Sequence, residues 1–166
     1  IWIHRFYSGP PRRRMPRLTH PEQVLFSGLK PPPVLAVCEH FAGSQILMEK
    51  AFTIQQQMGP VFDITCDCED GAPEGKEREH AEMVANVINS PLNHHRMAGV
   101  RIHDFSHPHW RKDVEILVGT SGNLLSHITL PKPVSARQVG EMIDYIGHVA
   151  DNSGVKRPIP IHVLIE

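Results

Sequence analysis

Apolar and polar residues alternate from residue 61 to residue 71, and this pattern predicts a strand with two chemically different faces. The apolar positions are Phe62, Ile64, Cys66 and Cys68, and the polar positions are Asp63, Thr65, Asp67 and Glu69. Carboxylates become denser toward the C-terminal end, where Asp70 and Gly71 end the strand. Since α/β active sites lie at the C-terminal ends of parallel strands, we expect helices on the apolar face and chemistry on the acidic face. The alternative is an antiparallel edge strand with one solvated face.

Further strands are predicted to alternate with helices along the chain after residue 33. Short apolar or alternating runs predict strands at residues 34–38, 99–104, 127–132 and 159–166. Apolar residues at helical spacing predict helices between the strands, beginning after Ser44, at Pro73, near Trp110 and after Ser135. Such alternation is typical of βα units, so a parallel sheet with right-handed crossovers is expected.

The parity of polar residues in several strands favours a TIM (β/α)8 barrel, an α/β fold, over an open sheet. In the third predicted strand, Arg101 and His103 share one face, whereas Val100 and Ile102 share the other. We expect an inner face that carries Asp67, Glu69, Arg101, His162 and Glu166, and helices that cover Cys66, Ile102, Val163 and Ile165. A complete barrel has eight βα units in about 250 residues. The chain is therefore expected to supply about the first five strands.

The composition is that of an ordinary globular protein with one sizeable core, at 166 residues, 40% hydrophobic and 21% charged. The net charge of -1 gives no general attraction to nucleic acid or anionic membranes. No apolar run approaches the roughly 20 residues that span a bilayer. We therefore expect a cytoplasmic protein without nucleic-acid or membrane partners. Residues 1–30 are basic and proline-rich, which predicts a flexible extension before a partial barrel domain at residues 31–166.

The cysteines and histidines allow more than one interpretation. Three cysteines do not predict a disulfide framework, and the pair Cys66 and Cys68 favours buried packing over half of a zinc site. The spacing of His103, His107 and His109 would suit zinc, but this segment contains proline and lacks helical spacing. Solvated loop histidines are therefore the favoured interpretation.

Two basic residues also have alternative interpretations. Arg101 could hold a substrate, or it could form a structural ion pair with Asp67 or Glu69, because buried charges need partners. Lys132 could form a Schiff base, or it could be a loop lysine that binds a phosphate or carboxylate.

Four short motifs resemble those of the HpcH/HpaI aldolase/citrate lyase family, which includes the citrate lyase β-subunit and malyl-CoA lyase. Cys66-Asp67-Cys68-Glu69-Asp70-Gly71 resembles the family's Asp-Leu-Glu-Asp-Ala/Gly motif, and Val100-Arg101-Ile102 resembles its Val-Arg-Ile/Val-Asn strand. Leu130-Pro131-Lys132 is similar to its Leu-Pro-Lys strand end, and Leu164-Ile165-Glu166 is similar to the start of its Ile-Glu-Thr segment. The order and spacing of these motifs agree from about residue 34 to residue 166.

This resemblance implies a Mg²⁺-dependent carbon–carbon lyase or synthase that acts on small 2-oxo or hydroxy acids and on CoA or similar thioesters. Carried over by position, Glu166 would be a direct metal ligand, and Arg101 would hold the oxygens of the oxo acid. Glu69 and Asp70 would orient metal-bound water or the substrate, and Lys132 would bind substrate. The second carboxylate ligand of the family, an aspartate, would follow Glu166. A homo-oligomer is expected for the full-length protein.

The chain also departs from the family pattern at two places. Residues 37–43 lack the basic residues with which the family contacts CoA, so thioester binding stays open, and His103 replaces the usual asparagine. One alternative is therefore a non-catalytic or divergent barrel homologue that acts as an interaction module. Another is an acyl-CoA thioesterase or synthase of the same family. The chain by itself is expected to be an inactive N-terminal fragment.

Overall fold

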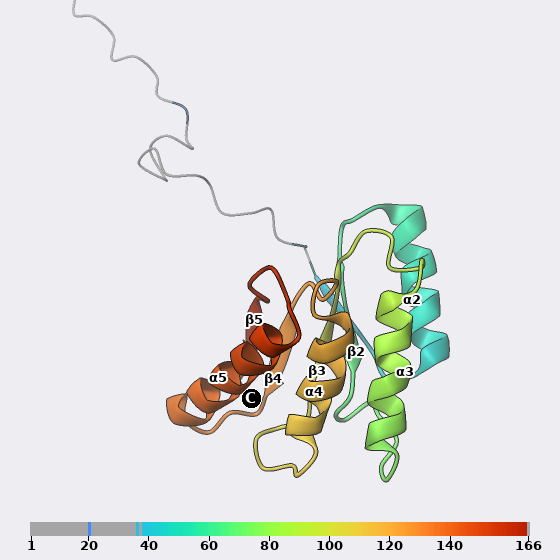
Figure 1. The fold of residues 1–166 in the computed structure, drawn as a ribbon. Coiled ribbons are helices and arrows are strands. Elements are labelled where there is room, and N and C mark those ends of the chain that lie inside the picture. Colours follow the sequence, from blue (N-terminus) through green and yellow to red (C-terminus); the bar gives the residue numbers. More distant parts are fainter. Residues whose placement is uncertain (1–19, 21–35, 37, 166) are drawn as a thin grey trace, which may run out of the picture. The chain divides into compact units, whose positions relative to one another are not determined.

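The computed structural model of the chain describes residues 20, 36 and 38–165. One compact unit, Ala36–Glu166, contains the helices and strands that the structure describes (Figure 1). Apart from His20, the predicted extension at residues 1–30 lies outside the described residues, as does the predicted metal ligand Glu166. In the described part of the chain, no helix combines the length and the apolar character needed to cross a membrane.

The described residues form one sheet of five parallel strands. The strands are β1 (Glu39–Ala42), β2 (Asp63–Asp67), β3 (Ala98–Arg101), β4 (Ile128–Pro131) and β5 (Ile161–Leu164). Each strand pairs with its neighbour in the chain, so the spatial order is β1-β2-β3-β4-β5. A doubly wound sheet would reverse its order at a switch point, whereas sequential parallel strands are those of the first part of a (β/α) barrel. The predicted fold class is confirmed.

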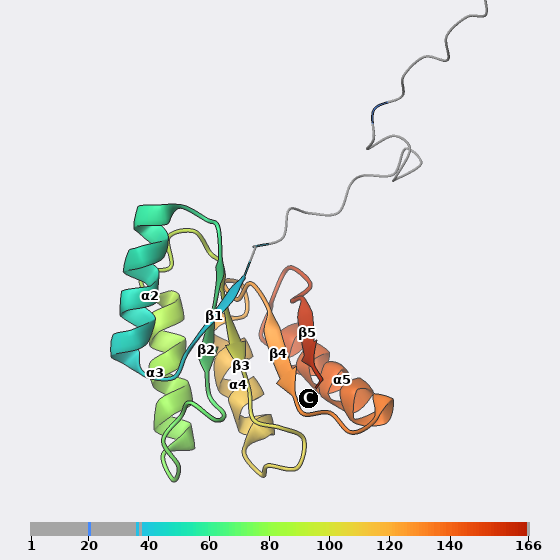
Figure 2. The ribbon, with the colours of Figure 1, turned by 180° about the vertical axis from the view of Figure 1, so that it is seen from behind.

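The four helices of the described residues lie on one face of this sheet, as the opposite views in Figures 1 and 2 show. They are α2 (Gln45–Met58), α3 (Glu77–Asn89), α4 (Trp110–Ser121) and α5 (Ala136–Asn152). As predicted, the hydroxyls of Ser44 and Ser135 cap α2 and α5 by accepting a hydrogen bond from the backbone N–H three residues later. The prediction that α3 begins at Pro73 is wrong. Gly75 adopts a φ of 77°, which is left-handed, so the helix begins only after this turn.

The first strand also begins later than predicted. The structure places β1 at Glu39–Ala42 rather than at residues 34–38, most of which lie outside the described residues. A glutamate is accommodated in this strand because its carboxylate accepts hydrogen bonds from Thr65 of β2 and bonds to His127. The apolar pattern did not predict this strand because Glu39 faces inward and is paired with polar side chains rather than buried in the hydrophobic core.

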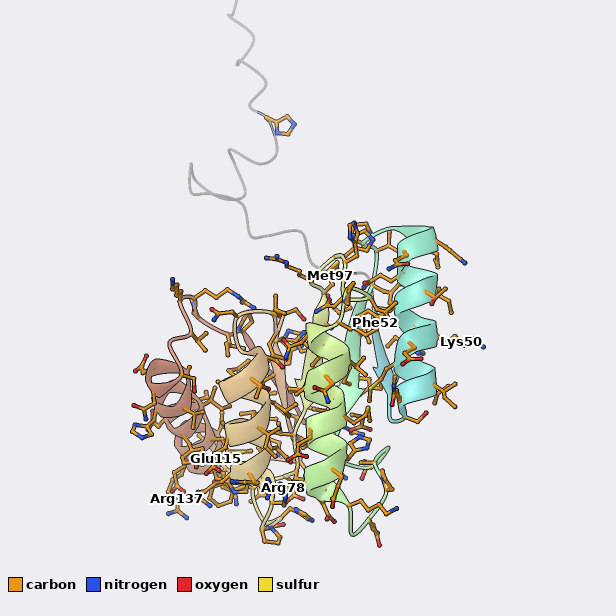
Figure 3. The ribbon with its side chains drawn as sticks, turned by 45° about the vertical axis from the view of Figure 1, so that its right-hand side comes forward. Lys50, Phe52, Arg78, Met97, Glu115 and Arg137 are labelled. Atoms are coloured by element: carbon orange, nitrogen blue, oxygen red, sulfur yellow. The ribbon has the colours of Figure 1, made fainter. Side chains whose placement is uncertain are left out.

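The hydrophobic core lies between the sheet and the helices. Its sheet residues are fully buried and alternate along the strands, namely Ile64, Cys66, Val100, Ile102, Ile128 and Leu130. Phe52 of α2 is also fully buried, and Figure 3 shows it on the inner side of the helix with Lys50 on the outer side. The predicted helix-facing positions Cys66 and Ile102 are therefore confirmed.

The predicted burial of Val163 and Ile165 is wrong, because their side chains are 41% and 80% exposed. Among the described residues, β5 pairs only with β4, so it is an edge of the sheet. The outward positions of an edge strand are covered only when a further βα unit packs against them. The parity was correct, but the covering elements are not part of the described chain.

The opposite face of the sheet carries a polar layer near the N-terminal ends of the strands. Its members come from β1, β2, β4 and β5 and are Glu39, Thr65, His127, Thr129 and His162. The His127 and His162 rings stack at a centroid distance of 4.1 Å. The hydrogen bond from His127, opposed in part by burial, lowers the pKa of Glu39 to about 2. The inward placement predicted for His162 agrees with this layer.

Candidate active site

A bidentate ion pair joins the C-terminal ends of β2 and β3. The register pairs Asp67 with Arg101, so both side chains project on the same face of the sheet. Arg101 Nε donates to Asp67 Oδ1 at 2.8 Å, and Arg101 Nη2 donates to Asp67 Oδ2 at 2.6 Å. Both residues are buried. The structural ion pair that the sequence offered as an alternative is therefore present, and it fixes the guanidinium plane.

Asp67 also organises the loop that follows β2. Its Oδ1 accepts a hydrogen bond from the N–H of Glu69 at 3.0 Å, and its Oδ2 accepts one from the N–H of Gly71 at 2.9 Å. Burial raises the pKa of Asp67, but the hydrogen bonds from Arg101 and from these N–H groups outweigh it, so the pKa lies below its ordinary value. Asp67 is therefore an anion at neutral pH that holds both the arginine and the acidic loop.

A close backbone approach shapes the same loop. Gly71 lies against Gly43, the residue after β1, and a Cβ atom on Gly43 would clash with the Gly71 carbonyl. Since backbone atoms cannot swing away as side chains do, only glycine fits at position 43. This contact brings the end of β1 against the acidic loop.

Glu69, Asp70 and Lys132 complete the charged group. Lys132 follows β4 with a left-handed φ of 49°, and its Nζ donates to both Asp70 oxygens at 2.9 and 3.0 Å. It also lies 3.1 Å from Glu69 Oε1. Arg101 Nη1 lies 3.1 Å from Glu69 Oε2 and 3.5 Å from Asp70 Oδ2. Two cations thus lie among three carboxylates contributed by β2 and its loop.

The pKa values within this group follow from burial and charge. Burial raises the pKa of Glu69, and this effect exceeds the lowering by Lys132 and Arg101. Hydrogen bonds to Asp70 and Glu69 raise the pKa of Lys132 above its ordinary value. Lys132 is therefore fully charged at neutral pH, which favours binding of anions and disfavours the Schiff-base interpretation, since that chemistry needs a neutral amine.

A cavity of about 290 Å³ opens beside these charges. Its lining residues come from the loops that follow β2, β3 and β4 and from the start of α3, namely Glu69, Asp70, Ala72, Pro73, Glu74, Glu77, His103, Asp104, His107 and Lys132. Arg101 does not line it directly, but it contacts Glu69 and Asp70, which do. The cavity therefore lies where ligands bind in parallel α/β folds, at the C-terminal ends of the strands.

The structure brings together four of the five predicted site residues, Arg101, Glu69, Asp70 and Lys132. The fifth, Glu166, lies outside the described residues. The inner-face placement predicted for Asp67, Glu69 and Arg101 agrees with these contacts. Their roles in catalysis or binding stay predictions, because proximity alone does not assign a role.

The donor atoms at this site fit a hard cation such as Mg²⁺, which prefers carboxylate oxygen and retains several waters. Glu69 Oε2 is buried and makes no hydrogen bond with a described residue, although it lies 3.1 Å from Arg101 Nη1. Two clusters of potential ligands occur in the described chain, and neither includes Glu69, although the cluster of His103, His109 and Asp113 reaches the cavity through His103. One of them contains the stacked His127 and His162, whose parallel rings cannot both direct nitrogen lone pairs at one ion.

One part of the site was missed by the sequence. His103 is buried rather than a solvated loop histidine, and its Nδ1 donates to Asp113 Oδ2 at 2.6 Å. The same oxygen accepts a hydrogen bond from the His103 backbone N–H at 3.0 Å, and Asp113 Oδ1 bonds to His109 Nδ1 at 3.0 Å. Asp113 could have indicated this pair in the sequence, because a carboxylate on the apolar face of α4, beside Val114 and Leu117, needs a buried partner.

The chain is similar to proteins of known structure. No protein-family model and no curated protein matches the chain. Among solved structures, the chain is similar to a citrate lyase from Burkholderia xenovorans LB400, with 44% sequence identity and a TM-score of 0.77. The match covers 80% of this chain and 42% of that protein, so the chain spans less than half of the length of this relative.

Proposed function

Because this chain belongs to the HpcH/HpaI aldolase/citrate lyase family, we propose that it carries part of the active site of a carbon–carbon lyase. The substrate is a small 2-oxo or hydroxy acid, and a CoA or similar thioester is a further candidate. The observation that supports this most is the placement of Arg101 and Lys132 at the ends of adjacent strands, beside one cavity. Two oriented cations next to a cavity suit an anionic substrate.

Lys132 is the cation that reaches the substrate first. Its side chain is 37% exposed, and it lines the cavity together with Asp70, whose side chain is 59% exposed. A substrate carboxylate can replace the exposed Asp70 carboxylate on Lys132 without leaving a buried charge unpaired. Asp70 would then turn to solvent.

Arg101 supports the opposite side of the substrate. Asp67 occupies its Nε and Nη2, which leaves Nη1 directed at Glu69 and Asp70. Because the Asp67 pair prevents rotation of the guanidinium, Nη1 can donate to a substrate oxygen at little cost in conformational entropy. A fixed donor of this kind stabilises negative charge that develops on an enolate oxygen.

Mg²⁺ fits the same site as a cofactor, with Glu166 as the proposed ligand and with Glu69 and Asp70 orienting its water. When bound, the ion supplies a Lewis acid that draws electron density from the substrate carbonyl. Glu69 Oε2, which is buried and lies 3.1 Å from Arg101 Nη1, is a carboxylate oxygen of the kind that hard cations prefer. A carboxylate whose pKa is raised by burial gains most when a cation lies beside it.

Calorimetry with the full-length protein tests the proposal. Oxalate and pyruvate serve as probes, titrated with MgCl2 and again with excess EDTA. Lys132→Met is expected to weaken oxalate binding by about 10- to 100-fold, the value of one or two charge-assisted hydrogen bonds. Lys112→Met is the matched control, because Lys112 pairs with Glu115 on the surface of α4. Absence of binding of both probes to the wild-type protein with Mg²⁺ would reject the proposed function.

Arg101→Ala is expected to abolish turnover, since losing an oxyanion donor costs about 3 to 4 kcal/mol of transition-state stabilisation. The same substitution leaves Asp67 without its partner, so a loss of activity has to be read beside the thermal stability of the variant. Full activity in Arg101→Ala would remove this residue from the mechanism.

A further inference from the structure

A histidine with one engaged and one available ring nitrogen lies in the wall of the candidate cavity. His103 lines that cavity with Glu69, Asp70 and Lys132. Its Nδ1 is bonded to Asp113, while its Nε2 makes no hydrogen bond with a described residue and is not shut off from solvent. A carboxylate can only accept, so Nδ1 carries the proton and Nε2 of the neutral ring is a free base.

Asp113 holds this ring in one orientation. The carboxylate is completely buried in the first turn of α4, and Oδ2 binds both the ring Nδ1 and the backbone N–H of His103. On its other side, the His103 ring stacks on His107 at 4.0 Å between centroids, with the planes 15° apart. A histidine whose tautomer and rotation are both fixed by a buried carboxylate is arranged for proton transfer rather than for packing.

We propose that His103 is a catalytic proton-transfer residue, that Asp113 is its positioning residue, and that the pair acts on the hydroxy-acid and enolate forms of the substrate. This inference rests on the proposed lyase function. In the cleavage direction, His103 Nε2 takes the proton of the substrate hydroxyl, and the O–H electron pair becomes the new C=O bond. The adjacent carbon–carbon bond breaks, and its electron pair forms the enolate. His103 then gives the proton to the enolate carbon, so the His103 ring is neutral again at the end of the step.

The surroundings of His103 set its protonation. Burial lowers the pKa of His103, but Asp113 raises it by more, and Glu77 and Glu69 add to this rise. Other titratable groups face the same space. His107 stacks on the ring, His109 of the loop before α4 shares Asp113, and Asp70, Glu74, Asp104 and Lys132 line the same cavity. Because the ordinary pKa of histidine lies near neutral pH, an imidazole is the side chain best suited to act as both general acid and general base.

Exchange of the pyruvate methyl protons for deuterium isolates the proposed step, because it needs only removal and return of a proton at the enolate carbon. The full-length protein with MgCl2 is incubated with pyruvate in D2O, and the exchange is followed by proton NMR. His103→Gln is expected to slow the exchange by at least about 100-fold. Its affinity for pyruvate, measured by calorimetry, is expected to stay within about threefold of wild type. His148→Gln, on the exposed face of α5, is the matched control.

The Asp113→Asn variant separates positioning from folding. Without the carboxylate, the pKa of His103 falls, so the rising limb of the exchange rate against pH is expected to move to lower pH. The maximal rate is expected to fall as well, because the ring is no longer fixed. If Asp113→Asn does not fold, NMR titration of the His103 ring in the wild-type protein replaces it, and saturating oxalate is expected to shift the His103 titration midpoint.

The outcomes distinguish this proposal from the function on which it rests. One set of results overturns the role of His103 while the lyase function stands: the wild type exchanges the pyruvate protons, Lys132→Met loses binding, and His103→Gln keeps more than a third of the wild-type exchange rate. If wild type neither binds nor exchanges pyruvate, both are overturned. A His103 titration that oxalate leaves unchanged also overturns the role of His103.

Discussion

Asp67→Asn is expected to lower the free energy of unfolding by about 3 kcal/mol at pH 7. The substitution keeps the shape of the side chain but removes its charge and turns one acceptor into a donor. Asp67 accepts four hydrogen bonds, two from Arg101 and one each from the N–H groups of Glu69 and Gly71. The amide oxygen of an asparagine can still accept the two hydrogen bonds of one carboxylate oxygen. Its NH2 group would face the other two donors and cannot accept a hydrogen bond from them.

The magnitude follows from the burial of the pair. The side chains of Asp67 and Arg101 are 5% and 10% exposed, so water cannot replace the lost partner. Breaking a buried ion pair by removing one member typically costs about 3 to 5 kcal/mol. We take the lower end, because Arg101 retains contacts with Glu69 and Asp70.

Urea denaturation of the full-length wild type and of its Asp67→Asn variant, followed by circular dichroism, measures the difference in the free energy of unfolding. Arg78→Gln is the control, because the Arg78–Glu82 pair has a similar distance of 2.9 Å but side chains that are 67% and 48% exposed. Figure 3 shows Arg78 at the surface of α3. Its loss is expected to leave the urea midpoint nearly unchanged, because exposed ion pairs are screened by solvent. If Asp67→Asn costs no more than this control, the pair does not stabilise the fold as argued.

Three further predictions concern other parts of the sheet. The pKa of Glu39 is lowered from 4.5 to about 2, so the stability that its carboxylate contributes is present above pH 4.5 and is lost as the pH falls toward 2. The difference in urea midpoint between wild type and Glu39→Gln should therefore shrink over that pH range. A difference that stays constant would contradict this. Gly43→Ala should cost about 1 to 3 kcal/mol because its Cβ meets the Gly71 backbone, whereas Gly140→Ala, with open space around it, should not destabilise. We expect the 166-residue chain to self-associate through β5, an edge of the described sheet on which Val163 is 41% exposed. Val163→Lys should therefore lower the mass measured by light scattering, and an unchanged mass would exclude this edge as the cause.

Much of the sheet and part of the site could be predicted because strand periodicity is a local property. The alternation through Ile64 and Cys66 places these side chains against helices wherever the strand lies, so the opposite face has to receive Asp67 and Glu69. The sequence thus offered Asp67 and Glu69 as partners of Arg101, and the register of β2 and β3 gave the bidentate pair to Asp67. The N-caps Ser44 and Ser135 were equally predictable, because capping depends only on the next three residues.

What the sequence determined by itself is thus the order of the strands, their two faces and the carboxylates at the end of β2. Only the tertiary structure decided which charges meet: Glu39 became part of a strand because Thr65 and His127 lie across the sheet, and Asp113 could occupy an apolar stripe because His103 lies against it. The physical reason is that apolar burial is set by a repeating pattern along the chain, whereas a buried charge is tolerated only beside a specific partner. That partner is brought close by folding, often from a segment distant in sequence.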